Sequence, residues 1–465
     1  MPASWRGLRL CTGLALLLSH GRSEDTTDTD AIAGSSQEET LKSSDDHPEL
    51  RVFAQENTGT WGTRICHALR RFAPPWVRFV NAAENNTAAE AYDLAIMHED
   101  CSTGTEHTYG LVMNSSNPVV VVQHCYKFHG GRGIRFEEMW QHALLTVSYH
   151  NLSAEATNFP FLHVPWGVDG QVFKPPAAGP MRKPNKTVVV FGMGREDHEH
   201  GGWTFDDESH IEVLEAAALA GAEVRHIGDM YGRLCGMCDE YKDCDPSMSV
   251  RNMGSMLGVQ GPNFKQSLPA TSAFARIGSG VQIGKQARIN MDCFLGKVPK
   301  QCQKMPELGG KMPCDFHKNL GRISDEELIA ELQAARYVSA LRKFEGFEIP
   351  GIEALSVGTR PIIYDFIPGY AWYRKYSVEV TSLEPQKLVG QIRDTLLTEP
   401  KPLSSEELAE LQAQFDWRKI VPRIFDTAYR ELLTPRWKGS QAAAASDSQE
   451  SRKSPLLRRG RKNDL

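Results

Sequence analysis

Short hydrophobic runs alternate with longer amphipathic stretches in the first part of the chain. The runs lie at Arg51–Gln55, Val77–Val80, Leu94–Met97, Val119–Val122 and Leu145–Val147, and Phe161–Pro165 ends the series. Runs as short and apolar as these are typical of strands buried on both faces, which occur in parallel sheets covered by helices. A glycine-bearing turn over 56–62 and a helix over 63–71 are expected after the first strand. The pattern therefore predicts an α/β domain.

The same alternation returns further along the chain and predicts a second α/β domain. It starts with an almost wholly apolar strand at Thr187–Gly192, followed by a helix at Ile211–Ala220 and a strand at Val224–Ile227. It resumes with a helix at Asp325–Ala335, a strand at Tyr337–Leu341, a helix at Gly351–Val357 and a strand at Pro361–Asp365. A last helical region, Ser405–Leu433, is expected to break near Pro422, because proline lacks the N–H that a helix interior uses.

Length and composition set the domain limits. A chain of 465 residues predicts two domains, which we place at 50–170 and 171–400, with crossover helices at 401–434. The stretch 229–318 breaks the alternation and holds six cysteines, so we interpret it as an insertion in the second domain. The acidic segment 23–49 and the basic segment 435–465 are predicted to be a disordered linker and a disordered tail.

Charge and the first residues narrow the class of protein. The net charge is -6 with both signs mixed, which argues against nucleic acid as a main partner. Arg6 and Arg9 accompany the short apolar stretch Leu10–Leu18, which predicts a cleaved signal peptide over 1–22, with a short signal-anchor as the alternative. This stretch is too short to span a bilayer, and no other segment is a candidate transmembrane helix.

Glycosylation triplets and cysteines agree with entry into an oxidising lumen. The triplets begin at Asn85, Asn114, Asn151 and Asn185. Removal of the signal peptide leaves nine cysteines, most of which are expected to pair. We predict a Cys101–Cys125 disulfide, because both residues follow strands that would be neighbours, with Cys66 outside any disulfide. The six cysteines of the insertion are expected to pair among themselves.

The segment Phe344–Pro361 carries the strongest chemical signal. A short loop containing Gly346 leads from a strand into a helix, and the N–H groups at a helix start bind anions. Glu345 in the loop can accept hydrogen bonds from sugar hydroxyls, and Glu353 in the first turn of the helix can accept from the two neighbouring hydroxyls of a ribose. A phosphate bound between them would join the two groups. The alternative is an ordinary strand–loop–helix unit with surface carboxylates.

This segment resembles the signature of the retaining glycosyltransferases of the GT-B fold, the glycosyl transferases group 1. In that family two glutamates with seven residues between them bind the donor, the first at the transferred sugar and the second at the ribose. The match covers Glu345, Gly346, Phe347, Pro350, Glu353, Ala354, Gly358, Thr359 and Pro361. The resemblance implies two Rossmann-like domains facing a cleft, with the donor on 171–400 and the acceptor on 50–170. It implies a catalytic role for Glu345 and donor binding by Gly346, Phe347 and Glu353.

Other segments resemble the family in the order that it requires. Val164–Pro175 is similar to its interdomain stretch, Leu320–Leu328 to the lead-in to its donor helix, and Phe415–Trp417 to its last helix. The resemblance assigns Arg195 to the donor diphosphate and implies a catalytic His124 at the end of a strand, with His98 as the fallback. A structural role is the alternative for this histidine.

Gly59 and Gly62 are expected to bind the donor as well, because glycine lets backbone amides approach a diphosphate closely. The alternative for these two glycines is a plain tight turn.

Two features depart from the family pattern. The stretch 196–202 contains no lysine where members carry one after the diphosphate arginine, and Glu348 stands where the family prefers glycine. A leaving diphosphate needs positive charge around it, so both departures leave room for an altered donor or a weakened activity. The alternatives are therefore a nucleotide-sugar epimerase on the same fold and a non-catalytic sugar-binding protein.

The sequence predicts a retaining, hexosyltransferase-like glycosyltransferase that uses a nucleotide-sugar donor and a glycan, glycoprotein or small-molecule acceptor. We expect no cofactor and no metal, because the Asp-x-Asp patterns at 28–30 and 243–245 are interpreted as chance and Cys235 and Cys238 as disulfide cysteines. The final residues, Lys462–Leu465, resemble an endoplasmic reticulum retrieval signal. They favour the lumen of the endoplasmic reticulum over the Golgi, with secretion as the alternative.

Overall fold

The computed structural model describes thirteen stretches of the chain. They are residues 48–55, 60–80, 92–99, 104–115, 117–123, 136–151, 159–176, 186–191, 209–228, 233–236, 238–242, 298–343 and 347–434. The predicted signal peptide, linker, tail and retrieval signal lie outside these stretches, as do Cys101 and Cys125 of the predicted disulfide.

The first sheet is parallel throughout and has the order β2-β1-β3-β4-β5-β6. Its strands are β1 (Leu50–Ala54), β2 (Val77–Val80), β3 (Leu94–Glu99), β4 (Val119–Gln123), β5 (Leu145–Ser148) and β6 (Phe161–His163). Its helices are α1 (Thr60–Arg71), α2 (Gly104–Met113) and α3 (Phe136–His142). Every residue of β3, β4 and β5 is buried, which explains why most of their residues are apolar. The buried polar exceptions lie mainly at the carboxyl ends of these strands: His98, Glu99, Gln123, Thr146 and Ser148.

The second sheet is also parallel and has the order β12-β11-β10-β7-β8-β9. Its strands are β7 (Thr187–Phe191), β8 (Glu223–Ile227), β9 (His317–Gly321), β10 (Tyr337–Ser339), β11 (Pro361–Tyr364) and β12 (Val378–Val380). Its helices are α4 (His210–Ala220), α10 (Asp325–Ala334), α11 (Ile349–Ser356), α12 (Pro385–Leu397) and α13 (Ser405–Phe415), with short 3-10 turns η7 (Pro368–Trp372) and η8 (Arg374–Tyr376). The prediction of two Rossmann-like α/β domains is confirmed.

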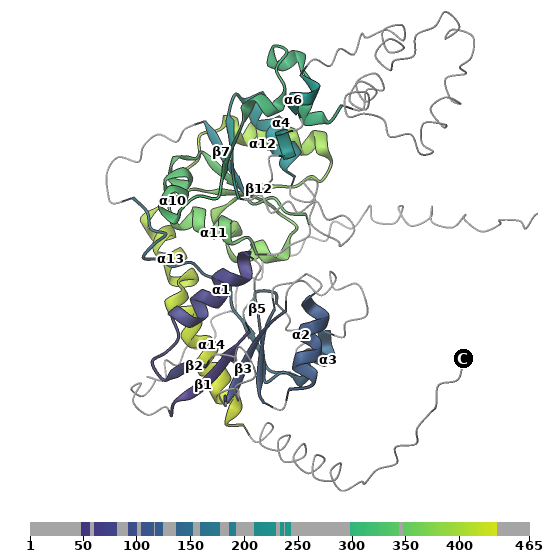
Figure 1. The fold of residues 1–465 in the computed structure, drawn as a ribbon. Coiled ribbons are helices and arrows are strands. Elements are labelled where there is room, and N and C mark those ends of the chain that lie inside the picture. Colours follow the sequence, from purple (N-terminus) through teal and green to yellow (C-terminus); the bar gives the residue numbers. More distant parts are fainter. Residues whose placement is uncertain are drawn as a thin grey trace, which may run out of the picture. The chain divides into compact units, whose positions relative to one another are not determined.

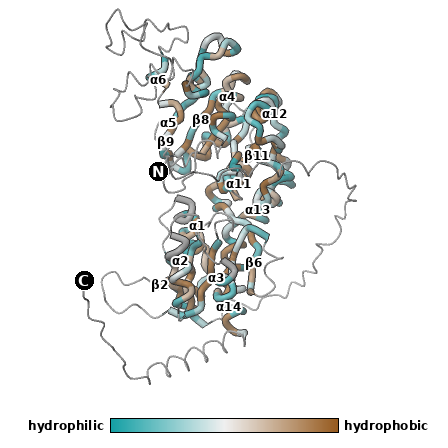
Figure 2. The backbone as a smooth tube through the Cα atoms, turned by 90° about the vertical axis from the view of Figure 1, so that its right-hand side faces the viewer, coloured by the Kyte–Doolittle hydropathy of each residue, from teal (hydrophilic) through white to brown (hydrophobic). Residues whose placement is uncertain are grey.

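Helices cover both faces of the first sheet. Figure 1 shows α1 and the last helix, α14 (Trp417–Leu432), on one face and α2 and α3 on the other. The alternating side chains of the strands separate two hydrophobic clusters, with Leu94 and Ile96 in one and Ala95 and Met97 in the other. Hydrophobic residues follow the strands in Figure 2, whereas the exposed helix faces are polar. Because helices cover both faces of this sheet, a ligand site can form only at the ends of the strands, where the loops lie.

The chain crosses between the domains where Gly167 and Val168 meet the start of α14. Val168 N–H donates to the carbonyl of Phe415 (2.8 Å), and Trp417 N–H donates to the carbonyl of Val168 (3.2 Å). A Cβ on Gly167 would lie 2.7 Å from the Phe415 carbonyl oxygen, so only glycine allows this close approach. The predicted interdomain stretch therefore touches the predicted crossover helices.

The expected helix break at Pro422 is wrong. The break lies at Asp416, whose carboxylate accepts from the N–H of Arg418 (2.9 Å) and begins α14. Pro422 lies inside α14, which leaves one helical hydrogen bond unmade without ending the helix. The contact with Val168 explains why the chain breaks at Asp416 instead.

The cysteine-rich segment is described in part. It contains the short helices α5 (Arg233–Gly236) and α6 (Cys238–Tyr241) and the 3-10 turns η4 (Lys300–Cys302), η5 (Pro306–Leu308) and η6 (Pro313–Phe316). Disulfides join Cys235 to Cys314 and Cys238 to Cys302, so four of the six cysteines pair within the insertion as predicted. Cys244 and Cys293 lie outside the described residues. Strand β9 begins at His317, inside the predicted insertion, because it continues the second sheet beside β8.

Candidate functional site

Each sheet has one point where the strand order reverses, and ligands of open α/β folds bind at such points beyond the carboxyl ends of the strands. In the first sheet β1 lies between β2 and β3, and in the second β7 lies between β10 and β8. The sequence after β1 contains Gly59 and Gly62, the sequence after β7 contains Arg195, and the sequence after β10 contains Glu345 and Glu353. These predicted site residues therefore follow strands at the two reversal points, whereas His124 follows β4, away from them.

Three of the predicted site residues lie in the described part of the chain, namely Gly62, Phe347 and Glu353. Gly62 lies in the first turn of α1, because the helix begins at Thr60 and not after Gly62 as expected. The other predicted residues lie outside the described residues: Gly59, His124, Arg195, Glu345 and Gly346.

Glu353 projects from α11 and is 2% exposed. Its Oε1 accepts a hydrogen bond from Nη1 of Arg64, a residue of α1. Its Oε2 is buried and has no hydrogen-bond partner among the described residues. An ionised oxygen in this position is costly unless a donor reaches it, so the site is suited to a ligand with hydroxyl groups.

Arg342 explains how Glu348 is tolerated beside the start of α11. The Arg342 Nε and the Glu348 Oε1 are 2.5 Å apart, and the two side chains are 6% and 8% exposed. Glu348 is the N-cap residue of α11, although its side chain makes no capping hydrogen bond. The carboxylate that replaces the family glycine is thus neutralised by a buried partner that the sequence analysis did not identify.

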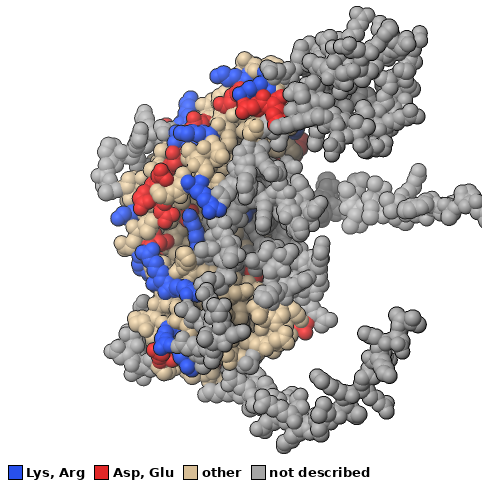
Figure 3. Space-filling view, in the orientation of Figure 1, with Lys and Arg blue, Asp and Glu red and all other residues tan. Residues whose placement is uncertain are grey.

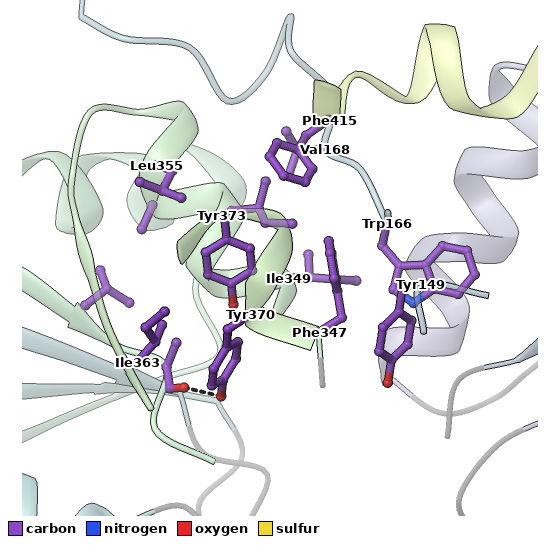
Figure 4. Close-up of a cluster of buried hydrophobic side chains, with 14 of the residues drawn as sticks. Tyr149, Trp166, Val168, Phe347, Ile349, Leu355, Ile363, Tyr370, Tyr373 and Phe415 are labelled. Carbon is purple, nitrogen blue, oxygen red and sulfur yellow. Dashed lines mark hydrogen bonds between the residues drawn. The ribbon is translucent and has the colours of Figure 1, made fainter. Parts of the chain in front are cut away.

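Phe347 anchors the loop before α11 in an aromatic cluster (Figure 4). Its ring centroid lies 5.3 Å from that of Tyr149, which follows β5 of the first sheet, and 5.9 Å from that of Tyr373. Phe415 completes the cluster at 6.2 Å. A Cβ on Gly351 would lie 3.0 Å from the Tyr373 hydroxyl oxygen, so α11 packs closely against the same ring. Phe347 therefore acts as a packing residue that fixes where α11 begins.

The carboxyl end of β3 places the fallback histidine, His98, beside Cys66 of α1. The Cys66 Sγ and the His98 Nε2 are 3.1 Å apart, and both residues are buried. Cys66 forms no disulfide, as predicted. The His98 carbonyl accepts from the Thr108 hydroxyl (3.0 Å), which ties β3 to α2. The buried cysteine–histidine contact was not foreseen, because the two residues are far apart in the sequence.

The start of α4, beyond β7, carries backbone strain and charge. Ser209 is the only non-glycine residue of the described chain with a positive φ (54°), and its hydroxyl lies 2.6 Å from that of Tyr364. Lys343, after β10, approaches Glu212 of α4 with Nζ and Oε1 3.8 Å apart. Strained backbone of this kind concentrates at functional sites, which agrees with the reversal point of the second sheet.

Buried histidines near the strands are held in the neutral form. Burial, with the nearby His210 and His317, lowers the pKa of His226 to about 2. Burial also lowers the pKa of His150 to about 3, with His163 adding to the effect. His226 Nδ1 lies 3.2 Å from His317 Nε2, so the two rings are within hydrogen-bond distance of each other. Neither His150 nor His226 is suited to carry a proton as a cation at neutral pH.

Charge is mixed over the described surface in Figure 3, where basic and acidic side chains lie side by side. Among the described helices, none is both long and apolar enough to cross a bilayer. Within the same described residues, the one group of side chains with metal-ligand spacing is Cys238, Cys302 and Cys314, and all three are disulfide-bonded.

Sequence comparison finds partial similarity to curated bacterial enzymes. The chain is 30% identical over 117 residues to the GDP-mannose:cellobiosyl-diphosphopolyprenol alpha-mannosyltransferase of Xanthomonas campestris, covering 24% of this chain and 31% of that protein. It is 28% identical over 118 residues to the protein of the same name from Xanthomonas oryzae, with the same coverage of 24% and 31%. The match thus spans about a third of the length of these relatives. No protein-family model matches the chain.

Comparison with solved structures finds distant likenesses. The sucrose-phosphate synthase of Thermosynechococcus elongatus is 14% identical with a TM-score of 0.48, covering 83% of this chain and 99% of that chain. AviGT4, a glycosyltransferase involved in avilamycin A biosynthesis, is 11% identical with a TM-score of 0.42, covering 83% and 98%.

Proposed function

We propose that this protein is a retaining glycosyltransferase that moves a sugar from a nucleotide-sugar donor to an acceptor. Two parallel α/β domains, the two-glutamate motif after β10 and the partial similarity to curated mannosyltransferases support the proposal. The donor would lie mainly on the second domain and the acceptor mainly on the first. The reaction needs no resident cofactor in this scheme, because the nucleotide is part of the substrate.

The observation that carries the proposal is Glu353. It occupies the ribose position of the motif, is almost fully buried, and keeps one carboxylate oxygen without a partner among the described residues. Burial of a carboxylate with an unsatisfied oxygen is unfavourable by itself, which is expected where a ligand supplies the missing donor. Two vicinal ribose hydroxyls are donors of the right number and spacing for one carboxylate.

In the proposed reaction an acceptor hydroxyl oxygen bonds to the anomeric carbon of the donor sugar. The bond from that carbon to the diphosphate oxygen breaks, and the acceptor proton passes to the leaving diphosphate on the same face. The products are a glycoside and a nucleoside diphosphate. Glu345 would contact the transferred sugar, Arg195 would stabilise the charge that the diphosphate gains, and His124 would lie near the sugar. The protein then contributes positioning and electrostatic stabilisation.

We further propose that the reaction takes place in the lumen of the secretory pathway, with the endoplasmic reticulum favoured over the Golgi. The two disulfides support an oxidising compartment. The acceptor triplet at Asn114 supports it as well, because this side chain is exposed at the end of α2. Deletion of Lys462–Leu465 should release more protein into the medium of expressing cells, and an unchanged distribution would argue against retrieval.

The test is release of nucleoside diphosphate from a panel of nucleotide sugars, with GDP-mannose first because the curated relatives are named for it. Glu353→Gln should weaken donor binding by about tenfold to hundredfold, the effect of losing a charged hydrogen bond of about 1.5–3 kcal/mol. Glu345→Gln should lower turnover more than affinity, since charge develops on the sugar in the transition state.

Glu406→Gln is the matched control, because this glutamate is exposed in the first turn of α13. The neighbouring Glu407 is unsuitable, since it caps α13 and pairs with Arg360. Product analysis separates the alternatives: an epimerase converts the donor without releasing free diphosphate, and a binding protein gives neither product. Full activity and affinity in both Glu345→Gln and Glu353→Gln would refute the assignment of the donor site.

A further inference from the structure

Arg64 reaches from α1 of the first domain to the motif helix of the second. Its Nη1 donates to the Glu353 Oε1, and its Nη2 lies 3.9 Å from the Asp325 Oδ1. Glu353 is buried, whereas Asp325 is 60% exposed at the start of α10, so Glu353 is the more buried and the closer of these two carboxylates. One guanidinium thus lies between two carboxylates of the other domain.

This contact competes with the ligand that the motif is expected to bind. A ribose presents two neighbouring hydroxyl donors, which a carboxylate satisfies best with both oxygens. In the structure one of these oxygens is taken by Arg64 and the other has no hydrogen-bond partner among the described residues. A nucleotide that binds Glu353 through its ribose would therefore displace or share the guanidinium of Arg64.

The displaced guanidinium would have an anion within reach. In a nucleoside diphosphate the α-phosphate is attached through the 5′ oxygen to the same ribose, a few bonds from the 2′ and 3′ hydroxyls, so a long side chain that starts beside the hydroxyl-binding carboxylate has the length to reach it. Arginine presents a planar fork of donors that matches phosphate geometry. Arg64 is 37% exposed, so its side chain is not locked on every side. Burial also lowers the pKa of Arg64, with Asp325 opposing the shift, so a fuller anionic partner would stabilise its charge.

We propose that Arg64 binds the donor diphosphate and exchanges its contact with Glu353 for the phosphates when the nucleotide binds. The inference rests on the proposed function. It supplies a cation for the diphosphate from the first domain, because residues 196–202 of the second domain contain no lysine. In this scheme Arg64 leaves Glu353 to the ribose hydroxyls and contacts the phosphates from its position on α1. The diphosphate would be held by a group from each domain.

Isothermal titration with GDP, guanosine, UDP and uridine tests the proposal on the full chain. For whichever nucleotide binds the wild type, Arg64→Gln should weaken the diphosphate by about tenfold to hundredfold, as expected for a lost charged hydrogen bond. The matching nucleoside should bind as well as before or better, since Glu353 no longer pairs with a cation. Arg64→Lys should recover part of the diphosphate affinity and leave nucleoside affinity unchanged, and this variant decides the question if Arg64→Gln does not fold.

Arg70→Gln is the matched control on the same helix, since Arg70 packs over the ring of Phe79 and should change neither affinity. If the Arg64 variants lose equal affinity for the diphosphate and for the nucleoside, Arg64 has a purely structural role and the proposal is overturned. The proposal is also overturned if neither affinity falls. If the wild type binds no nucleoside diphosphate, the proposed function itself fails and the inference fails with it.

Discussion

Replacement of Glu348 by glutamine would test whether the buried pair with Arg342 is what allows a carboxylate at the start of α11. The two side chains are 6% and 8% exposed, with Nε and Oε1 2.5 Å apart. Charge centres about 4 Å apart attract by about 4 kcal/mol at an effective dielectric constant near 20, while desolvation costs several kcal/mol per ion. The intact pair is therefore close to neutral in stability, but removal of one partner leaves the other charge buried.

We expect Glu348→Gln and Arg342→Met each to reduce the free energy of unfolding by about 3–5 kcal/mol. The double variant should lose much less than the sum of the two, because no uncompensated charge remains. Urea unfolding gives the midpoint and slope for all four proteins, and the coupling follows from the cycle. Asp394→Asn is the control, since Asp394 pairs with Arg393 at the surface (68% and 44% exposed) and should lose less than about 1 kcal/mol. If Glu348→Gln loses no more than the control, the burial argument is refuted.

Three further outcomes are expected. Gly167→Ala should lower the melting temperature by several degrees, because its Cβ would overlap the Phe415 carbonyl, and an unchanged melting curve would contradict the close approach. Cys238→Ser should destabilise by less than the roughly 4 kcal/mol that chain entropy assigns to a 64-residue loop, because the second disulfide closes nearly the same loop; urea midpoints decide this. Between pH 7 and pH 5 the free energy of unfolding should fall by about 2 kcal/mol because of His226. Its pKa of about 2 in the folded protein lies below the unfolded value near 6.5, so only the unfolded chain takes up the proton in this range. His226→Gln should remove this part of the dependence of the unfolding free energy on pH.

The central strands were predictable because they are buried on both faces. The predicted strand Val77–Val80 also agrees with β2 at both ends, although only Val80 of this strand is buried. The edge strands β9 and β12 were missed, since His317–Gly321 is largely polar and Val378–Val380 is mostly half-buried or exposed. Helix α12 was also missed, although Leu388, Ile392 and Leu396 repeat with helical spacing and gave a usable signal.

The site was predictable only where a short motif carries it. The sequence predicts a role for Glu353 because its chemistry and spacing lie within one segment, and in the structure its carboxylate is buried. Arg342 could have been found, since it lies six residues before Glu348 with the opposite charge. The contact of Arg64 could not, because 289 residues separate it from Glu353 and only the packing of α1 brings them together.

The charge balance of the motif explains why a cation from outside it is needed. Between residues 342 and 353 the chain carries two cations and three carboxylates: Arg342, Lys343, Glu345, Glu348 and Glu353. Arg342 pairs with Glu348, and Lys343 approaches Glu212, so both cations of the segment already face carboxylates. A nucleoside diphosphate would add further negative charge, which a buried site tolerates only beside positive groups. Arg195, which follows β7 in the sequence, and Arg64 on α1 are the two arginines that our proposals assign to the diphosphate, one from each domain. Loss of both should therefore abolish diphosphate binding, whereas loss of either should only weaken it.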